Sequence, residues 1–535
     1  MLAPAYARRG HGHGHGRRRR IGPAFVVGLV VVLAAAGAAA YLLTHRGSGQ
    51  RAAAQRYVRA WVRGDVAGMW RALDPKAKKR FPQRRFTVLV RAANRAAGEK
   101  AVVARRVGGV HGGAVSVPVA VRTATFGVLR GTISLPVDGS GSSAGVAWDP
   151  SLRLPGLRRG EAVRRQQGPQ PARAQILAAD GTALDADPLG ASIAGSAGPP
   201  PTGLQRLYDA HLGGHPSMRL LFGTRVVART AAVRGRTLHT TIRPGLQHAA
   251  AAALGSKLGG VAVVRPHDGA VLALAGLAVS APQPPGSTFK IITVSGALDA
   301  KIATPASTYP VRTFAVLDGT KLRNASNEAC GGTLTNAFVV SCNSVFAPLG
   351  ARLGAKRLIA TARRFGFDER LGDRIPAAKP ATISSNLRDS LAVGAAAIGQ
   401  DRDLATPLVM AGVGATIAEG GRRPRLRIAT SDPPSFTRVV PRRVARQVRA
   451  MMLEVVRSGT GTAAALPGIE VAGKTGTAEL RPNSTSPKDA DAWFVAFAPA
   501  THPKVAVAVM LVGAGFGGKA AAPIARAVLQ AALNG

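Results

Sequence analysis

An apolar segment near the N-terminus constrains this chain most. Residues 21–43 are almost wholly apolar and carry no charge. A helix of this length crosses a hydrocarbon layer of roughly 30 Å, because each helical residue adds about 1.5 Å. Four arginines at 17–20 precede it, and positive charge stays on the cytoplasmic side. The sequence therefore predicts a cytoplasmic tail at 1–20, a single transmembrane helix at 21–44, and an extracytoplasmic remainder.

A cleaved signal peptide is the competing interpretation of the same segment. The apolar part of a signal peptide is shorter, about 7 to 15 residues, so the membrane helix is favoured. The His-Gly alternation from His11 to Gly16 is interpreted as part of the cytoplasmic tail. No Cys-x-x-Cys or mixed His/Cys spacing occurs, so no structural metal site is expected.

The formal net charge of +44 is extreme. One interpretation is a polyanionic partner, such as nucleic acid, anionic lipid or an anionic wall polymer. We favour arginines spread over solvated surfaces, because no stretch interleaves aromatic and basic residues as single-strand binders do. Nucleic acid is therefore not expected, while an anionic wall polymer stays open as a partner.

Residues 47–148 are predicted to form a small α+β domain. Tyr57 and Trp61 lie four residues apart and share a helix face. Later runs are rich in β-branched residues and typical of strands, at 101–107, 114–121 and 127–137. Helices followed by a curved antiparallel sheet suit a cone of the nuclear-transport-factor-2-like type. Nothing in the segment indicates chemistry, so we interpret it as a spacer.

The next segment, 149–229, is rich in Pro, Gly and Arg. Gly198-Pro199-Pro200-Pro201 interrupts any regular element. We interpret the segment as an extended linker, pedestal or dimerisation region.

Residues 230–535 have strand-like runs at both ends and helical stretches between them. An Asp-Gly turn between the first two runs indicates a hairpin. Two strand pairs are expected, at 261–264 with 271–275 and at 492–498 with 505–512, before a helix at 519–533. This order predicts a central antiparallel sheet with a helical insertion.

The first candidate motif is Ser287-Thr288-Phe289-Lys290, which follows Pro-Pro-Gly. A serine hydroxyl is a poor nucleophile at neutral pH and needs a neighbouring base. Lys290 shares a helix face with Ser287, and it can serve as that base if desolvation or another cation lowers its pKa. A helix N-terminus also places N–H groups near a developing oxyanion.

The second candidate motif is Ser341-Cys342-Asn343. The Ser341 hydroxyl can relay a proton between a lysine and a leaving group. The Asn343 side chain can donate and accept hydrogen bonds, so it can hold a peptide carbonyl and orient the lysine.

The third candidate motif is Lys474-Thr475-Gly476-Thr477, after a strand-like run at 469–473. Strand alternation places Lys474 and Gly476 on one face and the two threonines on the other. Gly473 and Gly476 leave room for a substrate strand, and Lys474 with a hydroxyl can bind a terminal carboxylate. A backbone N–H near Thr477 can complete an oxyanion hole with that of Ser287.

Each motif alone also fits a surface lysine, a helix cap or a strand end. In this order, however, they resemble the active-site motifs of the penicillin-binding transpeptidase and serine β-lactamase superfamily. The segment 284–290 is similar to the nucleophile segment of class B, monofunctional penicillin-binding proteins. Ile398-Gly399-Gln400, Thr406-Pro407-Leu408 and 473–477 are similar to further stretches of that family. The first domain resembles the nuclear-transport-factor-2-like (MecA-type) domain of certain members.

The resemblance implies an α+β multidomain membrane protein whose last domain has the transpeptidase fold and cross-links peptidoglycan. Ser287 would attack the penultimate D-Ala carbonyl of a stem peptide, with Lys290 as general base. D-Ala would leave, and an amine of a neighbouring stem would resolve the acyl-enzyme. Penicillins would acylate the same serine, without metal or organic cofactor. Proton transfer and substrate placement would fall to Ser341 and Asn343, and carboxylate binding to Lys474, Thr475, Gly476 and Thr477.

Cysteine pairing stays open at this point. Outside the membrane Cys342 can pair with Cys330, the only other cysteine, or it can remain a free, buried thiol.

The sequence also bears on three other functions. A class A serine β-lactamase places a glutamate for deacylation, and no Glu-x-x-Asn occurs between Asn343 and Lys474. A non-enzymatic β-lactam sensor would need a cytoplasmic output domain, which a short tail does not supply, and a wall-binding scaffold would not need the full set of Ser, Lys and Asn side chains in the three motifs. A glycosyltransferase would need a placed pair of acids, and acidic residues are few before residue 230.

Overall fold

The computed structural model describes Ala36 and residues 48–534, apart from 401 and 482–485. The segment predicted to be a transmembrane helix lies outside this range, except for Ala36. Within the described part, no helix has both the length and the apolarity that a membrane crossing requires.

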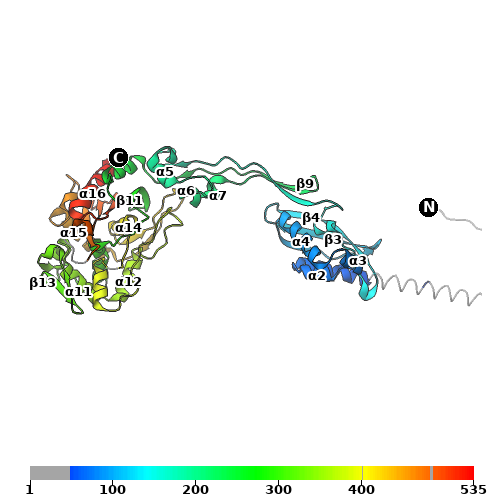
Figure 1. The fold of residues 1–535 in the computed structure, drawn as a ribbon, viewed down its shortest axis with the longest axis horizontal. Helices are drawn as coiled ribbons and strands as arrows, with labels where there is room; N and C mark the ends of the chain where they lie inside the picture. Colours follow the sequence, from blue (N-terminus) through cyan, green and yellow to red (C-terminus); the bar gives the residue numbers. More distant parts are fainter. Residues whose placement is uncertain (1–35, 37–47, 401, 482–485, 535) are drawn as a thin grey trace, which may run out of the picture. The chain divides into compact units, whose positions relative to one another are not determined.

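The chain divides into two compact units (Figure 1). The first comprises Met1–Gln170 and Pro216–Val233, and the second comprises Pro171–His215 and Arg234–Gly535. Each unit has hydrophobic core clusters of its own. The segment 149–229, predicted as a linker, is therefore shared between the two units.

The first unit combines helices with an antiparallel sheet. A helix covers residues 48–62, and the others are α2 (Val66–Arg71), α3 (Pro75–Arg80), α4 (Gln83–Ala97), η1 (Gly141–Ser143) and η2 (Pro150–Arg153). The strands are β1 (Glu99–Ala104), β2 (Val110–His111), β3 (Ala114–Thr123), β4 (Val128–Asp138) and β5 (Gly145–Val146). They pair in the order β1-β3-β4-β5, with β2 on β3. The three strands expected here are confirmed within a few residues.

Local signals explain these elements. Asp65 accepts a hydrogen bond from the Gly68 N–H at 2.8 Å and begins α2, as an N-cap does. Asp74 accepts from the Ala77 N–H in the same way and begins α3. Alternate residues of β3 are buried, because one face of the strand packs on the core.

A second, three-stranded sheet completes the first unit. Its strands pair in the order β6-β8-β9 and comprise β6 (Val163–Gln167), β8 (Met218–Phe222) and β9 (Arg225–Thr230).

Residues 171–215 are not an extended linker, contrary to the sequence interpretation. They form β7 (Ile176–Leu177), η3 (Leu184–Ala186), α5 (Pro188–Ala194), α6 (Gly203–Leu207) and α7 (Asp209–Gly213). Their apolar residues, among them Ile193 and Leu204, join the main core of the second unit. The apolar residues of this segment follow no helix or strand period, so the sequence pattern does not predict their burial. Each Å² of apolar surface that they bury on folding contributes about 25 cal/mol to stability.

The second unit is built around a five-stranded antiparallel sheet in the order β12-β11-β21-β20-β19. Its strands are β11 (Gly259–Arg265), β12 (Ala270–Gly276), β19 (Ala472–Glu479), β20 (Ala490–Ala498) and β21 (Val505–Leu511). Both predicted strand pairs and the predicted sheet with a helical insertion are confirmed. The strand β19, which carries Lys474, lies at one edge of this sheet, where a substrate strand can approach.

Most helices of the second unit come from the insertion between β12 and β19. They are η4 (Gly286–Phe289), α9 (Lys290–Asp299), η5 (Ala325–Asn327), α10 (Leu334–Val339), α11 (Asn343–Leu353), α12 (Ala355–Arg364), α13 (Ser390–Ala397), α14 (Pro407–Ala418), α15 (Arg442–Arg457) and η6 (Thr462–Ala464). Outside the insertion lie α8 (Pro244–Leu254), η7 (Pro487–Asp489) and α16 (Gly517–Asn534). The predicted C-terminal helix is confirmed.

Short strands complete the second unit. They are β10 (Leu238–His239), β13 (Thr308–Arg312), β14 (Phe314–Leu317), β15 (Thr320–Arg323), β16 (Cys330–Thr333), β17 (Arg422–Pro424) and β18 (Phe436–Arg438). They pair as β7 with β10, β13 with β16, β14 with β15 and β17 with β18.

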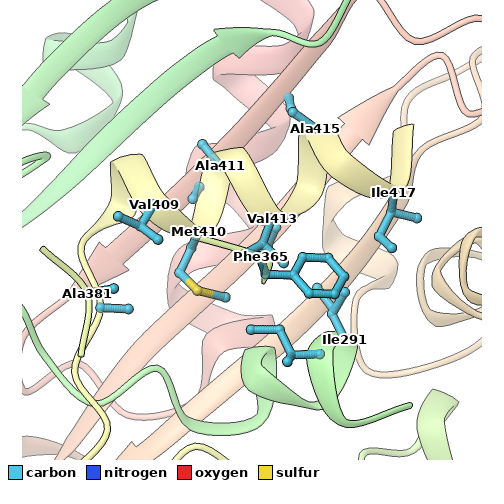
Figure 2. Close-up of a cluster of buried hydrophobic side chains, with 14 of the residues drawn as sticks. Ile291, Phe365, Ala381, Val409, Met410, Ala411, Val413, Ala415 and Ile417 are labelled. Carbon is cyan, nitrogen blue, oxygen red and sulfur yellow. The ribbon is translucent and has the colours of Figure 1, made fainter. Parts of the chain in front are cut away.

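The helix α14 is the centre of the main core. All of its residues are buried, as expected for a helix that is apolar on every side. Figure 2 shows Met410 and Val413 of α14 among apolar side chains that include Ile291 of α9 and Phe365. The helix that follows Ser287 is therefore anchored in the main core of the unit.

Candidate active site

Two glycines position the turn that carries Ser287. Gly286 has φ +51°, and a Cβ on it would lie 2.5 Å from the Thr477 carbonyl oxygen. Gly399 has φ +73°, and a Cβ there would lie 2.1 Å from the Gly286 carbonyl oxygen. The Gly286 N–H also donates to the Gly399 carbonyl at 2.9 Å. Only glycine permits this backbone conformation and this approach together.

Lys290 is the first residue of α9 and is fully buried. Its Nζ lies 2.9 Å from Ser287 Oγ and 2.6 Å from Asn343 Oδ1. It also donates to the Ser341 carbonyl at 2.7 Å and lies 3.4 Å from Ser341 Oγ. One amine therefore connects the first two candidate motifs.

The second motif forms the junction between α10 and α11. Ser341 has φ +63°, a left-handed conformation that is uncommon for a residue with a side chain. Cys342, which follows, is buried and disulfide-bonded to Cys330, with the two Cα atoms 5.8 Å apart. Of the two alternatives left open by the sequence, the disulfide is the one present. The Asn343 Nδ2 donates to the Arg323 carbonyl at 2.9 Å.

Lys474 of the third motif contacts Ser341 of the second motif. It is fully buried on β19, and its Nζ donates to Ser341 Oγ at 2.8 Å and to the Thr475 carbonyl at 3.0 Å. The hydroxyl of Ser341 thus lies between two lysines. The three motifs, which are far apart along the chain, meet in one site.

The two threonines of β19 have different surroundings from Lys474. The Thr475 hydroxyl lies 2.6 Å from that of Thr460, and the Thr477 hydroxyl accepts from the Gly517 N–H at 3.5 Å. Gly476 faces the nucleophile turn, because a Cβ on it would lie 2.9 Å from the Pro285 carbonyl oxygen.

Burial lowers the pKa of both lysines. Desolvation, with a smaller contribution from the nearby charge of Lys474, holds the pKa of Lys290 well below its usual range. Desolvation lowers the pKa of Lys474 to about 7. Both Nζ atoms lie over aromatic faces, Lys290 at 5.6 Å from the Phe346 ring centre and Lys474 at 5.5 Å from that of Phe338. A lysine whose pKa is lowered in this way and whose Nζ lies beside Ser287 Oγ has the properties of a general base.

Several residues of the site escaped sequence reasoning. Thr460 was not predicted, although the surrounding Gly-Thr-Gly-Thr run was a usable signal. Phe338 and Phe346 resemble ordinary core residues in sequence. Gly399 was noted only as part of a family stretch, and its contact with Gly286 was not foreseen. Among the described residues, no group of His, Cys, Asp and Glu side chains is arranged to hold a metal ion.

Comparison with known proteins gives a consistent classification. A family model described as the penicillin binding protein transpeptidase domain matches residues 259–530. The chain is 34% identical over 403 residues to peptidoglycan D,D-transpeptidase PbpA of Mycobacterium tuberculosis H37Rv, covering 62% of this chain and 80% of that protein. It is also 34% identical to PbpA of Mycolicibacterium smegmatis over 399 residues, covering 62% of this chain and 80% of the relative.

Comparison with solved structures gives the same family as the sequence comparison. The crystal structure of PBPA from M. tuberculosis matches with a TM-score of 0.59 and 29% identity, over 68% of this chain and 99% of that one. Its imipenem acyl-enzyme complex matches equally well, with the same score, identity and coverage. The chain belongs to the penicillin-binding protein transpeptidase family.

Proposed function

We propose that this protein is a peptidoglycan D,D-transpeptidase that cross-links stem peptides through an acyl-enzyme on Ser287 and is acylated there by penicillins. One observation carries the proposal: the buried Lys290 Nζ lies 2.9 Å from Ser287 Oγ and 2.6 Å from Asn343 Oδ1. Family membership and the names of the PbpA relatives support it.

In the proposed acylation, Lys290 takes the proton of Ser287 while Oγ attacks the penultimate D-Ala carbonyl carbon. Burial supports this role, because it lowers the pKa of Lys290. The backbone N–H groups of Ser287 and Thr477 stabilise the oxyanion. The peptide C–N bond then breaks, and the departing D-Ala nitrogen takes a proton from Lys290 through the Ser341 hydroxyl. A second amine reverses these steps and releases the serine.

The terminal carboxylate of the substrate is proposed to bind along β19. Lys474 supplies positive charge, and Thr475 and Thr477 supply hydroxyl donors. Gly476 lets β19 lie close to the turn that carries Ser287. These groups suit a carboxylate, because hydrogen bonds in which the donor or the acceptor is charged are stronger than those between neutral groups. The charge of Lys474 depends on pH, since its pKa is about 7.

The enzyme would lie on the outer face of a bacterial cytoplasmic membrane. The apolar run at 21–44 would anchor it, with residues 1–20 inside. Residues 47–148 would form a nuclear-transport-factor-2-like spacer. The second unit, Pro171–His215 with Arg234–Gly535, would contain the transpeptidase domain. The net charge of +44 would favour contact with anionic wall polymers.

Labelling with a fluorescent penicillin tests the proposal. The intact protein should form a stable one-to-one adduct, and Ser287→Ala should form none. Ser295→Ala is a matched control, because Ser295 is a buried serine of α9, the helix that follows Ser287, and its hydroxyl donates to the Ile291 carbonyl. Labelling that survives Ser287→Ala would reject the assignment. Rapid multiple turnover of a chromogenic cephalosporin would instead identify a serine β-lactamase.

A further inference from the structure

The first unit carries a large share of the positive charge. Its residues 48–170 and 216–233 hold 26 lysines and arginines but only 6 acidic residues. The densest stretch is 75–98, which has eight basic residues and no acidic one and which comprises α3 and α4. Charge of one sign that gathers on one surface attracts ligands of the opposite sign.

Three of these arginines lie in one line along α4. Arg84, Arg91 and Arg95 are exposed, and their spacing returns each of them to the same side of a helix. The line is about 16 Å long, because a helix rises about 1.5 Å per residue. The residues of α4 that are buried lie on the opposite side and are Phe86, Val90, Ala93 and Ala97. The line therefore faces away from the core.

The fold supplies no counter-ion to this line. Among the residues that the structure describes, no ion pair or cation–π contact involves any of its three side chains. The adjacent Arg85, in contrast, lies 5.6 Å from the Phe81 ring centre. Arg91 and Arg95 are four residues apart, and like charges at this spacing destabilise a helix. A bound anion would relieve that repulsion.

The aromatic side chains of the first unit narrow the class of anion. The buried ones are Tyr57, Trp61, Phe81, Phe86, Phe126, Trp148 and Phe222. Trp70 is partly buried, so no aromatic side chain of the described part of this unit is exposed. Single-stranded nucleic acids stack on exposed aromatic side chains, and amphipathic helices insert exposed apolar ones into a bilayer. The side of α4 that could insert packs on the core instead, which favours a soluble polyanion.

We infer that Arg84, Arg91 and Arg95, called here the arginine line, bind a linear phosphodiester polymer of the cell wall. The inference rests on the proposed function for its extracytoplasmic position and names a partner for the first unit. A guanidinium presents paired N–H donors that match the oxygens of a phosphate. Successive phosphates of one polymer chain can lie against successive arginines of the line. The first unit would then hold the enzyme at the wall polymer, beyond its role as a spacer.

Polymer binding by the full-length protein tests the inference. The protein is placed in phosphatidylcholine nanodiscs and titrated into fluorescently labelled poly(glycerol phosphate), and fluorescence anisotropy is followed at several salt concentrations. The test variant combines Arg84→Gln, Arg91→Gln and Arg95→Gln. Glutamine has nearly the helix propensity of arginine, so α4 should persist. Formation of the penicillin adduct at the rate of the wild type checks that the variant is folded.

The matched control removes the same charge from another surface of the first unit. It combines Arg164→Gln, Arg219→Gln and Arg229→Gln, which are exposed arginines of β6, β8 and β9. The α4 variant should bind the polymer about tenfold more weakly at low salt, the combined effect of three exposed ion pairs. Its plot of log affinity against log salt should lose about two units of slope, since each phosphate contact of a single strand contributes about 0.7. The control should change affinity less than about twofold.

Unchanged polymer binding by the α4 variant would overturn the arginine line. An equal loss in the control variant would also overturn it, because binding would then follow net charge alone. Phosphatidylglycerol vesicles are the competing arm, and displacement of the polymer by these vesicles at a lower phosphate concentration than by unlabelled polymer would identify a lipid surface instead. A wild type that binds the polymer but forms no penicillin adduct would reject the proposed function and leave the polymer site standing.

Discussion

The Oδ1 atom of Asn343 lies 2.6 Å from the Nζ atom of Lys290. The asparagine orients the lysine without adding charge, so burial can keep the pKa of Lys290 low. A carboxylate at the same place would reverse this effect, because an opposite charge at short range favours the protonated amine.

Asn343→Asp should therefore raise the pKa of Lys290 and move the acid limb of the acylation profile to higher pH. At neutral pH the rate of penicillin acylation should fall about 10²-fold, the lower end of general-base contributions. Stopped-flow acylation across pH measures both effects. Asn327→Asp, at an exposed asparagine of η5, is the control. An acid limb that stays in place would contradict the role of Asn343.

Lys474 should make stability depend on pH. Burial lowers its pKa to about 7, while an unfolded lysine titrates near about 10.4. Between these values the unfolded chain binds more protons, so the free energy of unfolding rises with pH. Lys474→Met should therefore be more stable than the wild type near neutral pH, and the difference should shrink toward about pH 10. Urea unfolding at several pH values measures it, with the exposed Lys356→Met as control. A pH-independent difference would be inconsistent with a neutralised Lys474.

The disulfide should contribute measurably to stability. Cys330 and Cys342 are separated by 12 residues, and closing a loop of this length stabilises the fold by about 3 kcal/mol in the chain-entropy model. Cys330→Ala should lower the free energy of unfolding by that amount in urea titrations. The wild type under reducing conditions should match the variant. Equal stability with and without reductant would show that the bond adds nothing.

Gly399→Ala should disrupt the nucleophile turn. The new Cβ would lie 2.1 Å from the Gly286 carbonyl oxygen, and that carbonyl precedes Ser287. Penicillin acylation should slow at least about tenfold, since small displacements of catalytic groups cost up to about 10²-fold. Gly468→Ala is the matched control, because Gly468 has φ +70° and nothing within 4 Å of its Cβ position. Equal acylation rates in the two variants would rule out a special role for Gly399.

Motif spacing predicted part of the site for local reasons. Ser287 and Lys290 lie three residues apart, so helical geometry alone brings them together. The faces of the strand on which Lys474 and its neighbours lie are also set locally, because successive residues of a strand point to opposite faces. The antiparallel sheet was predictable because its strands are apolar runs with clear turns, such as the hairpin of β11 and β12.

Other features were beyond prediction from sequence because they depend on contacts between distant segments. The apolar residues of 171–215 showed no regular period, so only the folded core reveals that Ile193 and Leu204 are buried. Thr460 becomes part of the site through Thr475, which lies on another element.

The sequence by itself determined the reactive groups, their order along the chain and the strands and helices that carry them, because these follow from local spacing and periodicity. Tertiary structure alone decided that Lys474 reaches Ser341, that Cys342 bonds to Cys330 and that both lysines lose their water. The physical reason is that desolvation and long-range pairing exist only once the sheet and its helical insertion have closed around these side chains.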